Sequence, residues 1–323
     1  MLVDKLIEKN WSNSFKLNFT IPSYNRIENL LEVIENFKLC KNSNFGVIIL
    51  DNASPDFNLN KINNSLNNIE FGLKLYRNKV HIGPDANLLR CMELSKSEWI
   101  YMLGDSKILR EDAVEIIIND IISNNKISSI VYSFDKVLSK STVITNLDHF
   151  FMTKIKFGDL FLGGNSLVKR NSFEEFYPIA SMLTLSRSML SIFHILNLNE
   201  SKAILFSEKR IVKKFIKKPN KYDPGLSLLE CWAQFGLLTT LKLRKKHQKK
   251  LNKLIINNEK YSNYLIFIKF CLIQIFRNKK EISSYLKKII NYRYVHHPFS
   301  IEKLFVFPLL FLSNLIEKIG NYD

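Results

Sequence analysis

Apolar runs and amphipathic segments alternate along the first 125 residues. "LNFTI" (17–21) predicts a short strand that stops at Pro22, and "FGVIILDNASPD" (45–56) predicts a second strand with a turn-rich exit. Between them lies a segment with apolar residues at helical spacing, namely Ile27, Leu30, Leu31, Ile34 and Phe37. Unbroken apolar strands joined by a helix indicate a parallel sheet covered on both faces.

The same alternation continues with strands expected at 72–78 and 98–103 and helices at 85–96 and 110–122. It predicts an α/β fold built on an open, doubly wound sheet. Ligands bind such sheets outside the carboxyl ends of the strands. The loops expected there are "PSYNR", "DNASPD", "HIGPDAN" and "GDSK", and each carries polar or acidic side chains suited to a nucleotide.

The pattern changes in the second half of the chain. "DLFLGGNSLVKRNSF" (159–173) predicts a turn, a strand and a basic exit, and helices, many of them basic, are expected from about residue 222. Turn chemistry at 223–225 precedes them. We therefore predict one domain over residues 1–220 and a helical basic region over 221–323, in which Trp232 is a core residue.

Charge separates the two halves. The chain has 47 Lys and Arg against 30 Asp and Glu, a net charge of +17. Residues 1–160 hold 19 basic and 19 acidic side chains, so residues 161–323 hold 28 against 11. This asymmetry indicates contact with a polyanion, either an anionic membrane or nucleic acid, or else a solvated Lys-rich surface.

Cysteine spacing and apolar segments indicate the cellular compartment in which the protein is expected. The four cysteines are far apart and match no zinc or disulfide spacing, which favours a reducing cytoplasm and buried thiols. "MLVDKLIEKNW" interrupts its apolar residues with charges, so no signal peptide is expected there. Residues 304–316 are very apolar but too short for a membrane span, and they fit an interfacial segment or a core helix equally well.

Four motifs in order carry a family resemblance. "FTIPSYNR", "VIILDNASPD", "HIGPDANLLRCMELSKSEWIYML" and the following "GDS" resemble the family 2 glycosyltransferases of the GT-A fold, especially bacterial enzymes of O-antigen, capsule and lipooligosaccharide synthesis. The resemblance covers residues 16–125 well and fades toward 215. It implies a nucleotide-diphosphate sugar donor, with a UDP-sugar favoured, and a glycan or polyprenyl-linked acceptor.

The resemblance implies roles for the strand-end residues. Asp51 would hydrogen-bond the base, and Asp105 is the first acid of a metal-binding "DxD" pattern for Mn²⁺ or Mg²⁺. The expected donor-nucleotide site comprises Pro22, Ser23, Tyr24, Asn25, Asp51, Asn52, Gly83, Asn87 and Asp105. Asp51 and Asn87 would also fit as caps of a turn and a helix. Their joint occurrence in four ordered motifs favours the functional interpretation.

Lys107 stands where the second acid of the pattern is expected. An ammonium does not ligate a cation, but it stabilises negative charge on a leaving diphosphate. The first hypothesis is metal-independent transfer with Lys107 on the phosphates, helped by Arg187 or Arg210. The second keeps a metal on Asp105 and another carboxylate such as Asp135. The third is a degenerate protein with a binding or assembly role.

Inverting transfer needs a general base for the acceptor hydroxyl. The stretch where the family carries acids, 176–190, has none here, and the nearest candidates are Glu174, Glu175, Asp159, His149 and His194. We name Glu175, although a solvated helix start explains it as well. Gly163, Gly164 and Asn165 are the expected acceptor contacts, with a simple turn as the alternative for the glycines.

The basic segment 241–255 has only partly clustered apolar residues and would suit an anionic lipid surface. We therefore expect a cytoplasmic enzyme peripheral at the inner face of the cell membrane. A nucleic-acid-binding protein is the alternative from another class. Charge alone supports it, because no nucleic-acid-binding motif is recognisable.

Overall fold

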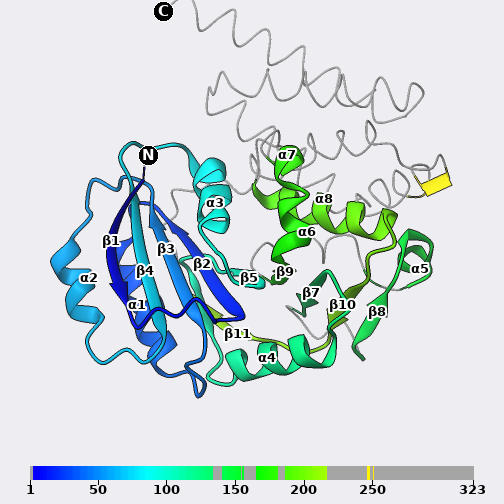
Figure 1. Ribbon diagram of the computed structural model, residues 1–323, viewed down its shortest axis with the longest axis horizontal. Helices are drawn as coiled ribbons and strands as arrows, with labels where there is room; N and C mark the ends of the chain where they lie inside the picture. Colours follow the sequence, from blue (N-terminus) through cyan, green and yellow to red (C-terminus); the bar gives the residue numbers. More distant parts are fainter. Residues whose placement is uncertain are drawn as a thin grey trace, which may run out of the picture. The chain divides into compact units, whose positions relative to one another are not determined.

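The computed structural model describes residues 3–133, 140–153, 155, 165–180, 186–216, 246, 247 and 250, without the side chains of residues 186–188, 214 and 215. The chain divides into two compact units, Met1–Pro219 and Asn220–Asp323. All the helices and strands named below lie in the first unit (Figure 1).

A nine-stranded sheet is the centre of this unit, in the order β1-β4-β3-β2-β5-β9-β7-β10-β8. Its strands are β1 (Val3–Lys9), β2 (Leu17–Ser23), β3 (Gly46–Asp51), β4 (Gly72–Asn78), β5 (Trp99–Met102), β7 (Ser129–Tyr132), β8 (Thr142–Ile144), β9 (Ser166–Lys169) and β10 (Ile204–Ser207). A separate ribbon pairs β6 (Lys107–Leu109) with β11 (Val212–Phe215).

The strands β4, β3, β2 and β5 are parallel neighbours, whereas β9 runs antiparallel to both β5 and β7. The carboxyl ends of β2, β3, β4, β5 and β7 therefore meet at the edge where β9 begins. We call this edge the ligand edge, because open α/β sheets bind their ligands there.

Helices cover both faces of the sheet (Figure 1). They are α1 (Ile27–Lys38), α2 (Leu59–Ser65), α3 (Pro84–Glu93), α4 (Ala113–Ser123), α5 (Leu147–Met152), α6 (Arg170–Glu174), α7 (Tyr177–Ala180) and α8 (Ser186–Asn199). Successive side chains of a strand point to opposite faces. In β3, Val47 and Ile49 join the core that includes α1 and α4, whereas Ile48 and Leu50 pack with Cys91 of α3.

The predicted α/β architecture is confirmed, with differences at its borders. β2 continues through Pro22 instead of stopping before it. The backbone of Thr20 faces β5, accepting the N–H of Leu103 at 3.0 Å, and Pro22 faces the same side after β5 has ended, so its missing N–H breaks no ladder bond. β1, β6, β7, β8, β10 and β11 were not expected from the sequence. Their pairing partners lie far away in the chain.

Four expectations fall outside the described residues. They concern the turn at 223–225, Trp232, the basic segment 241–255 and the apolar segment 304–316. Among the described helices, none combines the length and the apolar character needed to cross a membrane.

Candidate functional site at the carboxyl edge of the sheet

Three of the parallel strands end in one row of polar residues. The register pairs Ser23 of β2 with Asp51 of β3, and Asp51 with Arg77 of β4. The turns that follow use left-handed backbone conformations at Asn25 (φ 53°) and Ala53 (φ 58°), which are uncommon for residues other than glycine. Such conformations gather where a ligand must be approached closely.

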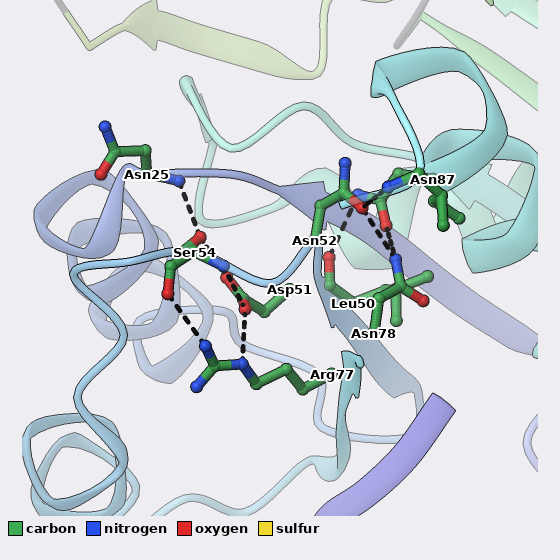
Figure 2. Close-up of polar contacts among 9 residues, drawn as sticks. Asn25, Leu50, Asp51, Asn52, Ser54, Arg77, Asn78 and Asn87 are labelled. Atoms are coloured by element: carbon green, nitrogen blue, oxygen red, sulfur yellow. Dashed lines mark hydrogen bonds and ion pairs between the residues drawn. The ribbon is translucent and has the colours of Figure 1, made fainter. Parts of the chain in front are cut away.

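Asp51 is buried and already has three donors (Figure 2). Its Oδ2 accepts the backbone N–H of Ser54 at 3.0 Å and lies 3.3 Å from Nε of Arg77, and its Oδ1 accepts the Ser54 hydroxyl. Arg77 also donates from Nη2 to the carbonyl of Ser54 at 2.9 Å and lies over the ring of Phe57. The carboxylate thus stabilises the 51–54 turn, which is the turn-capping role that the sequence also allowed for Asp51. A hydrogen bond that Asp51 would accept from an N–H of the base stays a prediction.

Three buried side chains, Asn52, Asn78 and Asn87, form what we call the asparagine cluster (Figure 2). Nδ2 of Asn78 donates to Oδ1 of Asn52 at 3.0 Å and to Oδ1 of Asn87 at 2.9 Å. Asn52 also donates to the carbonyl of Gly83 and accepts the N–H of Ile82. The cluster fastens the β4–α3 loop to the strand ends, so Asn52 and Asn87 are placed to position this loop.

The β4–α3 loop places the ring of His81 against that of Tyr24, which follows β2. Tyr24 is 42% exposed, and its ring centroid lies 4.4 Å from that of His81. Gly83 has φ 85° and ψ 159°, a conformation open almost only to glycine. A Cβ at Gly83 or Gly104 would meet no heavy atom of the described residues within 4 Å. No described residue therefore fills the space beside these two turns of the ligand edge.

Asp105 follows β5 and is 5% exposed. Its Oδ1 accepts a hydrogen bond from Nη1 of Arg26 at 2.9 Å, and its Oδ2 accepts the hydroxyl of Ser23 at 3.4 Å. Arg26 is the N-cap residue of α1, yet its side chain makes no capping bond there. The structure thus brings Ser23 and Asp105 together, as predicted, and adds a guanidinium that sequence reasoning had not named.

Lys107 lies two residues beyond Asp105 and is 8% exposed. Its backbone N–H donates to the carbonyl of Gly104 at 3.1 Å and closes a turn, and it begins β6 opposite Phe215 of β11. Within this one turn the chain carries a carboxylate and an ammonium, and Arg26 adds a second cation.

Among the described residues, the side chains around Asp105 do not fit the metal that the "DxD" pattern implies. Both oxygens of Asp105 already accept hydrogen bonds, and the second ligand position is Lys107. No group of three His, Cys, Asp or Glu suited to a metal exists among the described residues. A divalent cation about 4 Å from the Arg26 guanidinium would meet a repulsion of about 8 kcal/mol at an effective dielectric constant of 20, before further screening by water.

The two other cations predicted for the diphosphate have different outcomes. Arg210 donates from Nε to the carbonyl of Val212 at 2.9 Å and from Nη2 to that of Lys213. Val212 pairs with Leu109, at the opposite end of β6 from Lys107, so the structure does not bring Arg210 beside Lys107. Arg187 lies on α8, and its side chain is outside the described residues.

Glu175 is far from the ligand edge. It follows α6 at the exit of β9, and the pairing of Lys169 with Trp99 puts that exit at the amino end of β5, away from Asp105. Its exposed carboxylate forms an ion pair with Lys202, just before β10 begins. The antiparallel direction of β9 is the reason for this position, which does not support Glu175 as a general base.

The acceptor contacts and remaining base candidates are only partly described. Asn165 lies at the ligand edge, where its carbonyl accepts the N–H of Tyr132 and its buried Oδ1 has no partner among the described residues. His149 belongs to α5, where its backbone N–H donates to the side chain of Asn146. Four predicted residues fall outside the described residues, namely Asp135, Asp159, Gly163 and Gly164.

His194 is fully buried between two strands. Its Nδ1 lies 3.1 Å from the hydroxyl of Ser129 on β7, and its Nε2 lies 3.1 Å from that of Ser166 on β9. Burial lowers the pKa of His194 to about 3, so the ring is neutral at physiological pH. It fastens α8 to the sheet and is a structural residue.

Sequence reasoning missed Arg26, Arg77, Asn78 and Ser54. Arg26 is part of the quoted motif "FTIPSYNR", and Arg77 and Asn78 end the predicted third strand. Their position just beyond apolar strands was the available signal, because side chains there reach the ligand edge. Which partners they would choose depended on the register between strands.

A family model described as "Glycosyl transferase family 2" matches residues 19–176. The abequosyltransferase RfbV of Salmonella typhimurium is 32% identical over 103 residues, which are 31% of this chain and 31% of that relative. The alignment thus spans less than a third of the relative's length.

Solved structures resemble the fold at low identity. Residues 1–349 of TarS from S. aureus align with a TM-score of 0.65 and 11% identity over 95% of this chain and 91% of that chain. The mannosyltransferase PcManGT from Pyrobaculum calidifontis, in complex with GDP-Man and Mn²⁺, aligns with a TM-score of 0.56 and 10% identity over 93% of this chain and 86% of that chain. These likenesses and the family match confirm the predicted GT-A fold and glycosyltransferase class. Within this chain, residues 19–176 are thus similar to glycosyl transferase family 2.

Proposed function

We propose that this protein transfers a sugar from a nucleoside diphosphate sugar to a glycan or lipid-linked acceptor in bacterial surface-polysaccharide synthesis. The observation that carries the proposal is the convergence of Ser23, Arg26 and Asp105 at the ligand edge of a family 2 domain. TarS has been solved with UDP-GlcNAc, with a TM-score of 0.62 and 12% identity over 86% of this chain and 81% of that chain. This supports a nucleotide-sugar donor, and a UDP-sugar is favoured.

The proposed transfer is inverting, as the family resemblance implies, and independent of a divalent metal. Lys107 takes the place of the second acid and would place its charge on the diphosphate as the leaving group departs. The engagement of Asp105 by Arg26 supports the same conclusion. A metal held by Asp105 with Asp135 is the alternative, since a structural neighbour was solved with Mn²⁺.

Calorimetric titration of UDP and GDP into the protein, first with EDTA and then with excess MnCl₂, tests the proposal. Equal affinity in both conditions supports a metal-independent donor site. Binding only with MnCl₂ would replace it by the metal alternative. Absence of binding, together with no hydrolysis of a panel of nucleotide sugars, would favour the degenerate protein with a binding or assembly role.

We further propose that residues 221–323 form the basic helical region that meets an anionic membrane on its cytoplasmic side, where a polyprenyl-linked acceptor would lie. The 28 basic against 11 acidic side chains of residues 161–323 support this contact. Co-sedimentation with vesicles containing anionic lipid, but not with neutral vesicles, is the expected result. Salt-sensitive binding to nucleic acid without vesicle binding would favour the alternative class instead.

A further inference from the structure

Arg26 occupies an unexpected position on the one acid that remains of the metal-binding pattern. Its Nη1 lies 2.9 Å from Oδ1 of Asp105, and the side chain of Arg26 is 36% exposed whereas that of Asp105 is 8% exposed. One side of the guanidinium therefore holds a buried carboxylate while another part of it reaches solvent at the ligand edge. An arginine presents five N–H donors, so this contact leaves several for a second anion.

The local charge differs from that of a metal-binding site. Two acids and a divalent cation would sum to zero, whereas Asp105, Arg26 and Lys107 sum to +1. A diphosphate group carries at least two negative charges at neutral pH. A site with net positive charge attracts it without a cation, and a planar guanidinium also suits phosphate oxygens geometrically.

The backbone supports this role for Arg26. Its φ of −148° and ψ of 49° stand at the N-cap of α1, and the preceding Asn25 is in the left-handed region with its N–H bonded to the hydroxyl of Ser54 at 2.8 Å. The turn that aims Arg26 is therefore tied to the 51–54 turn. Anions are also favoured near the amino end of a helix, and Arg26 is the N-cap residue of α1.

We propose that the Arg26 guanidinium takes the place of the divalent cation on Asp105 and, together with Lys107, binds the donor's diphosphate. The inference rests on the proposed donor site and names its second cation. It also predicts that a metal site would not return when only the second acid is restored, because Arg26 would still hold the first.

The first experiment measures affinities for UDP and UMP in EDTA by calorimetry. Arg26→Gln should weaken UDP binding at least tenfold and UMP binding much less, because UMP lacks the second phosphate. Arg90→Gln is the matched control, since Arg90 forms an exposed ion pair with Glu93 at the far end of α3 and should leave both affinities unchanged. If Arg26 only stabilised the fold, both nucleotides would weaken equally, and that result would overturn the inference.

The second experiment titrates MnCl₂ alone and follows free Mn²⁺ by electron paramagnetic resonance. Lys107→Asp should bind Mn²⁺ no better than the wild type, whereas Arg26→Gln combined with Lys107→Asp should gain a site with Kd below about 1 mM. Equal Mn²⁺ affinity in the single and double variants would contradict the inference. This readout needs no nucleotide, so it stays decisive if the wild type binds neither UDP nor GDP and the proposed function fails.

Discussion

The stability of the asparagine cluster should depend on the Nδ2 group of Asn78, which donates hydrogen bonds to both of the other asparagines. In Asn78→Asp an oxygen replaces Nδ2 without a change of shape, so two hydrogen bonds of 3.0 and 2.9 Å become contacts between acceptors. Asn52 Oδ1 keeps the N–H of Ile82, but Asn87 Oδ1 loses the donor it has here. Two lost bonds at about 1 kcal/mol each and a buried acceptor without a donor, at about 1–3 kcal/mol, predict a loss of at least about 3–5 kcal/mol, to which the burial of the new carboxylate adds.

Two measurements test this prediction. Urea unfolding followed by circular dichroism gives the stability change, and hydrogen exchange of the peptide spanning 79–90 reports the local loosening of the β4–α3 loop. Asn67→Asp adds the same charge at an exposed position and should change stability by less than about 0.5 kcal/mol. An Asn78→Asp protein within 1 kcal/mol of the wild type, with unchanged exchange in that peptide, would refute the reasoning.

Three further predictions concern His194, Glu175 and Gly83. Burial lowers the pKa of His194 from 6.5 to about 3, so as the pH falls the imidazole is protonated in the unfolded chain before it is protonated in the folded one. The contribution of His194 to the free energy of unfolding is therefore complete above pH 6.5 and should fall by about 2 kcal/mol between pH 7.5 and 5. Urea unfolding of His194→Gln should lack this part of the pH dependence. Glu175→Gln should keep the turnover rate within about threefold, because Glu175 pairs with Lys202 away from the ligand edge, whereas a general base would lose about 10²-fold or more; donor turnover with an active acceptor decides. Gly83→Ala should cost about 1–3 kcal/mol in urea unfolding through its backbone conformation, since no described atom obstructs the new Cβ, and an unchanged midpoint would contradict this.

Local pattern was enough to find the strands β2 to β5 and the helices α1 and α3, but not the short helix α2. Residues that are buried within one strand or along one helix face give apolar runs or helical spacing over a short stretch of the chain. Such patterns can be read from a single sequence. The same reasoning placed Ser23, Asp51 and Asp105 at the ligand edge, because parallel strands that are each followed by a helix all end on one side. The edge strand β1 escaped notice, since its pairing with β4 joins residues some seventy positions apart.

The sequence by itself determined the family resemblance, the parallel sheet and the edge that carries the polar loops, because these depend on residue type and order. Tertiary structure alone decided the partners of those residues. The direction of β9 moved Glu175 to the far edge of the sheet, and the strand register gave Asp51 to Arg77 and Ser54. The turn before α1 likewise aimed Arg26 at Asp105. Hydrogen bonds and ion pairs act over a few ångströms, so they are settled only when segments distant in the chain are brought into register.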